Sequence, residues 1–85
     1  MNRLWLQSVR GARDTLLNLT YAPDGRTLAT CGISGVIRIW DALTGQELLV
    51  LKGHKRQVNG IAFAPDGLSL ASCCHDGEVK LWRAR

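Results

Sequence analysis

The sequence lacks the features that mark a membrane-spanning, secreted or disulfide-bonded protein. No apolar run approaches the roughly 18 residues that a transmembrane helix needs. The basic residue near the N-terminus, Arg3, is not followed by an apolar stretch, so we expect no secretory signal. The three cysteines, with Cys73 next to Cys74, make a poor disulfide framework. These absences favour a reducing compartment, and we expect a cytoplasmic protein that does not contact membranes.

The composition is that of one small globular unit. Hydrophobic residues make up 46% of the 85 residues and charged residues 21%, which excludes a disordered chain. Eleven Lys and Arg against seven Asp and Glu give a net charge of +4. A mildly basic balance of this kind permits an acidic partner without requiring one.

The clearest feature of the sequence is an internal repeat with a constant offset. The string YAPDG at 21–25 returns as FAPDG at 63–67, a shift of 42 residues (63 − 21). The same shift takes Trp40 to Trp82 and is called one repeat from here on. Each copy consists of short apolar runs separated by turn residues. In the second copy we expect strands over 48–51, 58–63, 68–72 and 79–82, which are too short for helices. Pro-Asp-Gly and Asp-Gly are turn sequences, so the fold class is predicted to be all-β.

The second copy resembles the WD repeat. It has Gly-His at 53–54, FAPDG at 63–67, Asp-Gly at 76–77 and a closing Trp82, within the period of about 40–45 residues typical of that family. The resemblance implies a β-propeller built of four-stranded antiparallel blades, with two blades per chain. We divide the chain into a first, degenerate blade unit at residues 1–43 and a second at residues 44–85.

The resemblance also implies that the chain does not act alone. Two blades leave two sheet faces uncovered, and repeat proteins need about three units for stability. In the family, the strand before Gly-His belongs to the preceding blade. Residues 4–9 should therefore complete the last blade of another copy, in a head-to-tail homo-oligomer. Three copies would close six blades and four would close eight, and the resemblance favours the tetramer. The alternative is that the chain is a fragment of a larger WD-repeat protein.

One group of polar residues has two interpretations. Ser72, His54 and Asp76 are the residue types of a hydrolase nucleophile, base and orienting carboxylate. By resemblance, however, these three residues and Trp82 form a buried hydrogen-bonded tetrad that holds the blade together. A buried indole needs an acceptor and a buried imidazole needs a polar partner, so the structural interpretation is favoured. We therefore expect no enzyme, and the hydrolase remains the alternative.

The first copy departs from the family pattern. It keeps Thr30 and Trp40 at the tetrad positions but has Ala12 and Ser34 in place of the histidine and the aspartate. We expect this degenerate tetrad to leave the first blade looser than the second.

Metal and cofactor sites are not indicated. Cys73, Cys74 and His75 are adjacent, and neighbouring strand residues point to opposite faces. Zinc ligands are usually separated by two or more residues so that both can reach one ion.

The basic residues provide the only indication of a partner. They lie in the loops between outer and inner strands, which by resemblance form one rim of the disc, and they are Arg10, Arg13, Lys52, Lys55 and Arg56. A ring of such charges would suit an acidic protein or peptide. Few aromatic residues accompany them, so nucleic acid is disfavoured. The preferred function is a non-enzymatic, self-assembling scaffold for protein interactions, and a purely structural assembly is a further alternative.

Overall fold

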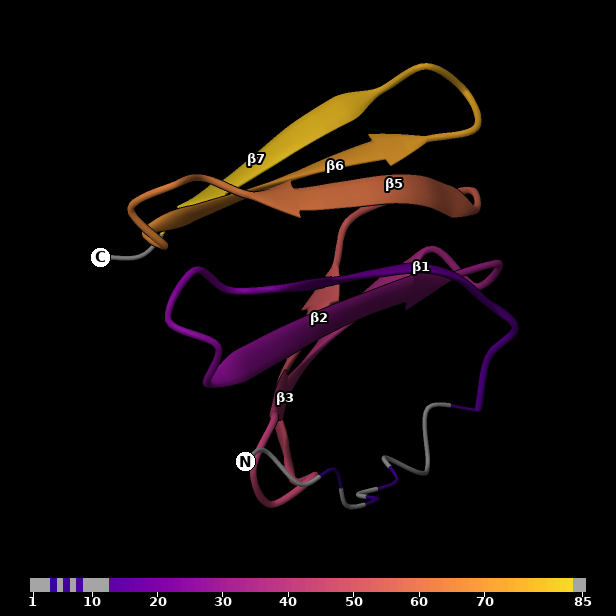
Figure 1. Ribbon diagram of the computed structural model, residues 1–85. Coiled ribbons are helices and arrows are strands. Elements are labelled where there is room, and N and C mark those ends of the chain that lie inside the picture. The colour runs from indigo at the N-terminus through magenta and orange to yellow at the C-terminus, as the bar shows by residue number, and fades with distance from the viewer. Residues whose placement is uncertain (1–3, 5, 7, 9–12, 84–85) are drawn as a thin grey trace.

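The computed structural model describes residues 4, 6, 8 and 13–83 of the chain, which form two stacked antiparallel sheets (Figure 1). The first sheet contains β1 (Leu16–Tyr21), β2 (Thr27–Gly32), β3 (Val36–Asp41) and β4 (Glu47–Lys52), in that order. The second contains β5 (Val58–Phe63), β6 (Ser69–Cys74) and β7 (Val79–Arg83). In the described part of the chain no helix is long and apolar enough to cross a membrane. The predicted all-β class is confirmed.

The strands form where the sequence alternates between apolar runs and turn residues. The YAPDG and FAPDG strings make the same turn in both copies, with Gly25 at φ 71° and Gly67 at φ 74°. In each turn the aspartate side chain accepts a hydrogen bond from the backbone N–H two residues later. This closure fixes the β1–β2 and β5–β6 hairpins in matching registers.

The sheets and the sequence repeats are out of phase. β4 lies in the second sequence copy, yet it pairs with β3 and completes the first sheet. The first sheet therefore has four strands, whereas the second has three among the described residues. Residues 1–43 and 44–85 thus mark the two copies of the sequence, and the boundary between the sheets falls after Lys52.

The core of the molecule lies between the two sheets. Its buried members come from both sheets and are Ala29, Cys31, Ile37, Ile39, Val58 and Leu70. Trp82, Phe63, Ile61 and Leu51 pack around them. Burying a side chain such as Ile37 completely contributes about 1.5–3 kcal/mol. One interface of this kind provides the hydrophobic stability of the described chain.

The other face of each sheet carries exposed apolar side chains. On the first sheet the strand register places the exposed Tyr21 and Leu19 on this face, together with the buried Trp40. On the second sheet it places Val79 and Leu81 on the outer face. These four aliphatic and tyrosine side chains are between 54% and 64% exposed. Contiguous exposed apolar surface of this kind marks interaction sites.

Candidate functional site

Three of the four predicted tetrad residues meet beside the interface of the two sheets. Ser72 on β6 accepts a hydrogen bond from the indole Nε1 of Trp82 on β7 at 2.9 Å. The same hydroxyl oxygen lies 2.6 Å from Nε2 of His54. His54 and Ser72 are both buried. One hydroxyl group therefore links the closing tryptophan to the loop that precedes β5.

Gly53 allows this loop to pass over the indole. A Cβ at Gly53 would lie 2.8 Å from Cη2 of Trp82, so a larger residue would displace the ring or the loop. The His54 ring meets the Trp82 ring edge-on, with 6.3 Å between their centroids. The Gly-His pair thus has a physical basis, because the glycine gives room for the approach and the histidine makes the hydrogen bond.

Asp76 is not brought into this group. Its carboxylate accepts a hydrogen bond from the backbone N–H of Glu78 at 3.0 Å, and this bond holds the pKa of Asp76 below its usual value. Nδ1 of His54 lies 3.9 Å from Oε1 of Glu78 and has no hydrogen-bond partner in the described part of the chain. The nearest carboxylate to the imidazole is therefore Glu78, which the sequence reasoning did not single out.

The first copy retains only the tryptophan half of the arrangement. Nε1 of Trp40 donates to Oγ1 of Thr30 at 2.9 Å, and both residues are buried. Ala12, the counterpart of His54, lies outside the described residues. Trp40 is only 2% exposed, whereas Trp82 is half-buried. Of the two indoles, the one in the degenerate copy is thus the more deeply buried.

An aspartate that the sequence analysis passed over ties the loops of the first copy together. The carboxylate of Asp14 accepts hydrogen bonds from the Ser34 hydroxyl at 2.6 Å and from the Ser34 backbone N–H at 3.1 Å. Ser34 occupies the position that Asp76 has one repeat later. In the first copy the carboxylate therefore comes from Asp14, in the loop before β1, and not from the β2–β3 turn. The sequence signal for this contact was an acidic residue well before a Ser-Gly turn. Predicting that Asp14 and Ser34 pair would also have required the strand register.

The geometry does not form a hydrolase site. Ser72 is 2% exposed and its hydroxyl is already engaged by Trp82 and His54. Asp76, the predicted orienting group, makes no hydrogen bond to the imidazole in the described structure. A catalytic serine needs an accessible hydroxyl and a base held by a third group. These residues instead hold a loop and an indole in place.

Acidic groups lie near some of the predicted basic residues. Arg10 lies outside the described residues, and the other four, Arg13, Lys52, Lys55 and Arg56, are exposed. Lys55, Arg56, Gln57 and His75 line one hollow. The backbone N–H of His75 donates to the Gln57 carbonyl at 2.9 Å and joins the two loops. Arg56 also helps to lower the pKa of Asp76, so this rim carries both signs of charge.

Cysteine and histidine side chains do not gather as metal ligands do. No group of three His, Cys, Asp or Glu side chains with that arrangement occurs within the ranges that the structure describes. Cys73 is exposed and Cys74 is buried, as expected for neighbours on opposite faces of a strand. Cys31 is buried in the core, and burial raises the pKa of its thiol to about 11.

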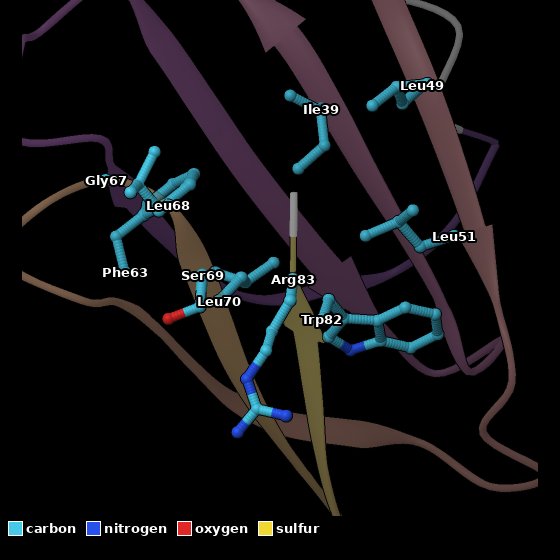
Figure 2. A pocket seen from close by; sticks show the side chains of 10 residues that line it. All are labelled: Ile39, Leu49, Leu51, Phe63, Gly67, Leu68, Ser69, Leu70, Trp82 and Arg83. Atoms are coloured by element: carbon cyan, nitrogen blue, oxygen red, sulfur yellow. The ribbon is translucent and has the colours of Figure 1, made fainter. Parts of the chain in front are cut away.

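An apolar hollow lies where the second sheet ends, beside β7. Figure 2 shows that Ile39, Leu49 and Leu51 of the first sheet and the indole of Trp82 line this hollow. Phe63, Leu68 and Leu70 line the cavity from the second sheet, and its volume is about 260 Å³. The cavity borders β7, the last described strand of the second sheet.

The comparisons with known proteins define the class of this chain. The WD40 family, described as "WD domain, G-beta repeat", matches residues 5–41 and 45–83. The chain therefore belongs to the WD40 repeat family, as the resemblance in the sequence implied.

Two proteins of Nostoc sp. (strain PCC 7120) are similar in sequence. The uncharacterized WD repeat-containing protein alr3466 is 44% identical over 45 residues, which are 53% of this chain and 3% of that protein. The uncharacterized WD repeat-containing protein alr2800 is 41% identical over 43 residues, which are 51% of this chain and 3% of that protein. The chain thus spans a small part of the curated relatives that it matches.

Two solved structures share the fold. The RRP9 WD40 repeats superpose with a TM-score of 0.85 at 26% identity, over 89% of this chain and 24% of that chain. The structure of U3-55K gives the same TM-score and identity, over 89% of this chain and 25% of that chain. The two sheets are therefore arranged as neighbouring blades of a WD40 propeller are, and the family is in general an interaction scaffold without catalysis.

Proposed function

We propose that this chain is a non-enzymatic interaction module that assembles head to tail with further copies of itself into a propeller ring. The observation that carries the proposal is the relation between the buried interface and the two exposed faces. Each exposed face is the repeat counterpart of one half of the interface that the two sheets already make. Two surfaces that pack together inside the chain thus recur on its two outer sheet faces, where some of their apolar side chains are exposed.

The half of the interface contributed by the first sheet recurs on the outer face of the second sheet. Four residues of the first sheet are buried there: Ala29, Cys31, Ile37 and Ile39. Their counterparts, each one repeat later, are Ala71, Cys73, Val79 and Leu81. Val79 is 64% exposed and Leu81 is 57% exposed. The second sheet therefore presents the surface that a third sheet would cover.

The half contributed by the second sheet recurs on the open face of the first sheet. Phe63, Leu70 and Trp82 contact the first sheet at the core. Their counterparts are Tyr21, Leu28 and Trp40, which share one face of the first sheet through the strand register. Tyr21 is 61% exposed on this face, Leu28 is partly buried and Trp40 is 2% exposed. The exposed part of this face, around Tyr21, is the surface that would pack on the outer face of another copy.

A contact between two different surfaces is heterologous, and it closes into a ring when the rotation per unit allows. With two sheets per chain, three copies give six blades and four copies give eight. We favour four copies, because the propellers of this family span about 4–8 blades and the larger ring bends each interface least. The solution mass tests the number: four copies of the 9.3 kDa chain weigh about 37 kDa and three about 28 kDa.

The direction of assembly can be tested by complementation. Leu81→Glu places a charge on the outer face and Tyr21→Glu places one on the open face, so each variant alone should remain a monomer. An equimolar mixture of the two retains one intact pair of faces and should form a dimer of about 19 kDa. A mixture that stays monomeric, with the parent chain assembled, would contradict head-to-tail packing.

Ile33→Glu is the matched control for these two variants. Ile33 is 52% exposed, comparable with Leu81, but it lies in the turn between β2 and β3. Its counterpart one repeat later is His75, so a polar residue is accepted at this position. We expect Ile33→Glu to assemble like the parent chain.

We further propose that the assembled ring binds an acidic protein or peptide at its basic rim, in the cytoplasm. Support comes from the exposed charges of Lys52, Lys55 and Arg56, which each copy would repeat, and from three cysteines that are all free thiols. Charge reversal of these three residues should abolish binding of a fluorescent poly-glutamate peptide while the solution mass stays unchanged. Equal binding by parent and variant would contradict the basic rim as the binding site and favour a purely structural assembly.

A second candidate follows from the comparison with the relatives. Because the chain spans 3% of each matched Nostoc protein, its two faces would suit further blades of a longer WD-repeat chain. In that case the same faces are used, but the covering sheets are covalently attached. A monodisperse 9.3 kDa species at high concentration would favour this candidate over self-assembly.

A further inference from the structure

Two loops of the second copy bring three nitrogen-bearing side chains to one hollow at the rim. Lys55 and Arg56 come from the loop between β4 and β5, and His75 comes from the loop between β6 and β7. The hollow has a volume of about 350 Å³, and Gln57 completes its lining. Ammonium, guanidinium and imidazole groups all donate hydrogen bonds, so the hollow offers several donors to one negatively charged group.

The two cations of this hollow keep their charge uncompensated. No ion pair between residues that the structure describes involves Lys55 or Arg56. The backbone hydrogen bond from Glu78 and, to a smaller extent, the charge of Arg56 lower the pKa of Asp76. The Asp76 carboxylate accepts that bond at 3.0 Å within its own turn and does not line the hollow. The hollow therefore retains a positive potential that an external anion would neutralise.

The backbone that carries these side chains is held in place from three directions. His54, which directly precedes the two cations, is buried, and its Nε2 lies 2.6 Å from Oγ of Ser72. The backbone N–H of His75 donates to the Gln57 carbonyl at 2.9 Å and joins the two loops. The turn at Gly35 packs against the same loop, since a Cβ there would lie 2.8 Å from the His54 carbonyl oxygen. A frame that is already ordered lowers the entropy cost of binding.

The first copy has the same backbone at this place but different side chains. The backbone N–H of Ile33 donates to the Thr15 carbonyl at 3.0 Å, which is the equivalent bond one repeat earlier. In place of the second cation and the imidazole, the first copy has Asp14 and Ile33. Arg13 alone remains a cation, at the position of Lys55. The equivalent surface of the first copy thus lacks two of the three donors and gains a negative charge.

We infer that the hollow of Lys55, Arg56 and His75 holds one oxyanion group of the acidic partner, and that the first copy carries no equivalent site. The inference rests on the proposed binding of an acidic partner at the rim. It locates that binding in the second copy and adds His75 to the binding residues. The group is a carboxylate or a phosphoryl group, since both accept charge-assisted hydrogen bonds from such side chains.

Two basic residues one repeat apart provide matched variants. Lys55→Glu and Arg13→Glu make the same change of charge at equivalent, exposed positions. We expect Lys55→Glu to weaken the binding of a fluorescent poly-glutamate peptide by about tenfold or more, because repulsion replaces a charge-assisted hydrogen bond. Arg13→Glu should weaken it by less than about twofold, through screened long-range charge alone. Fluorescence anisotropy measures both. Equal losses would overturn the inference and leave the basic rim as a whole in place.

His75→Ile tests whether the imidazole belongs to the site. This variant gives the second copy the residue that the first copy has, so the turn should accept it. All lysine and arginine charges remain, and we expect the affinity for the same peptide to fall about fivefold through loss of a donor. His75→Gln keeps a side-chain N–H and should retain most of the affinity. If His75→Ile binds the peptide as the parent chain does, the imidazole is not part of the site and the inference is overturned.

Peptides with different anionic groups separate the remaining outcomes. A short peptide with a single phosphoserine and its glutamate analogue show which group binds more tightly, and a preference for either supports the site if Lys55→Glu abolishes it. Titration calorimetry should give one phosphoserine peptide per chain. Two peptides per chain would show that the first copy also binds, which overturns the inference and leaves the proposed function in place. A parent chain that binds none of these peptides overturns both.

Discussion

The two sheets start from one sequence pattern and bury their closing tryptophans to different extents. Trp40 has a single hydrogen-bond partner, Thr30, and is almost completely buried. Trp82 shares Ser72 with His54, yet it remains half-buried. The strand pairing differs as well: Trp40 lies opposite Glu47 on β4, whereas β7 has no described strand on that side. We therefore expect the fourth strand to cover the indole more than the histidine does.

The loops of the two copies are also secured differently. In the second copy the hydrogen bond between His54 and Ser72 holds the loop before β5. In the first copy Asp14 joins its loop to Ser34 at the tip of the β2–β3 hairpin. Each contact holds the segment before the first strand of a sheet, β1 or β5, against that same sheet. The repeat thus maintains one backbone geometry with two unrelated side-chain pairs.

The sharpest test of this comparison is removal of the two indoles. We expect Trp40→Ala to lower the free energy of unfolding by about 3–5 kcal/mol, as for a fully buried tryptophan. Trp82→Ala should cost about 2 kcal/mol in the monomeric chain, because its ring is covered on fewer sides. Urea denaturation at low protein concentration measures both. If Trp82→Ala proves as costly as Trp40→Ala in the monomer, the fourth strand is not what covers the indole.

The hydrogen bonds of the two copies can be compared next. Ser72→Ala leaves both the Trp82 Nε1 and the His54 Nε2 without their partner, and should cost about 2–4 kcal/mol. Thr30→Val leaves only the Trp40 Nε1 without one and keeps the side-chain shape, so about 1–2 kcal/mol is expected. Denaturation midpoints at one pH give the ratio. Equal losses would indicate that the His54 contact adds nothing to the stability of the second sheet.

Two glycines, at equivalent positions of the repeat, compare a covered turn with an uncovered one. Gly35 has φ 84°, and a Cβ there would lie 2.8 Å from the carbonyl oxygens of His54 and Arg56. Gly77 has φ 92° with open space around it. We expect Gly77→Ala to cost about 1 kcal/mol from backbone strain alone, and Gly35→Ala about 2–3 kcal/mol. Thermal melts measure the difference in the monomer, and a larger loss at Gly77 would contradict it.

Gly77 also reports on assembly. If a second copy packs on the second sheet as the second sheet packs on the first, its backbone should approach Gly77 as His54 and Arg56 approach Gly35. Gly77→Ala should then weaken self-association by about tenfold, beyond its small effect on the monomer. Association that is unchanged in Gly77→Ala would contradict the equivalence of the two interfaces.

The smallest expected effect concerns the thiols. At pH 8 one cysteine per chain, Cys73, should react quickly with a soluble disulfide reagent, because Cys31 and Cys74 are buried. Assembly should slow the reaction of Cys73, since its counterpart Cys31 is buried by a neighbouring sheet. Two or more fast thiols in the folded chain would contradict the described packing.

The buried thiol of Cys31 makes the free energy of unfolding depend on pH. The pKa of Cys31 is raised to about 11 in the folded chain from an ordinary value of 9.0, so the folded state favours the neutral thiol. The unfolded chain loses this proton at lower pH, and stability should therefore fall as the pH rises from 9 toward 11. Cys31→Ala should lessen this decline, as denaturation midpoints across that range would show.

The sequence predicted most of the fold because the repeat and the turn residues carry local information. Val58–Phe63 forms a strand with the expected bounds, and residues 48–51 lie within the longer Glu47–Lys52. The sequence pattern grouped the strand at 48–51 with the three strands that follow it, whereas the resemblance placed the strand before Gly-His in the preceding blade; β4 pairs with β3, as the resemblance implied. Strand ends moved by one or two residues, since ladder hydrogen bonds rather than apolarity decide where a strand stops.

The site was harder to predict because it depends on side-chain direction. Asp76 and Glu78 lie two residues apart in one loop, and the sequence could not determine which carboxylate lies nearer to His54. The hydrogen bond from the backbone N–H of Glu78 to the Asp76 carboxylate holds the Asp76 side chain within its own turn. The contact of Asp14 with Ser34 required knowledge of how two loops meet. The shared hydroxyl of Ser72 was accessible to prediction, because a buried indole and a buried imidazole both require a partner.

The exchange of β4 across the repeat boundary has a consequence for how such chains can change length. A further copy of the repeat inserted between residues 43 and 44 would take its last three strands into a new sheet, while its first strand completed the old one. Every existing pair of strands would keep a partner of the same kind. Duplication or loss of whole units therefore alters the number of sheets without requiring a new interface. Gene duplication can thus change the length of the chain more easily than it can change the packing between sheets.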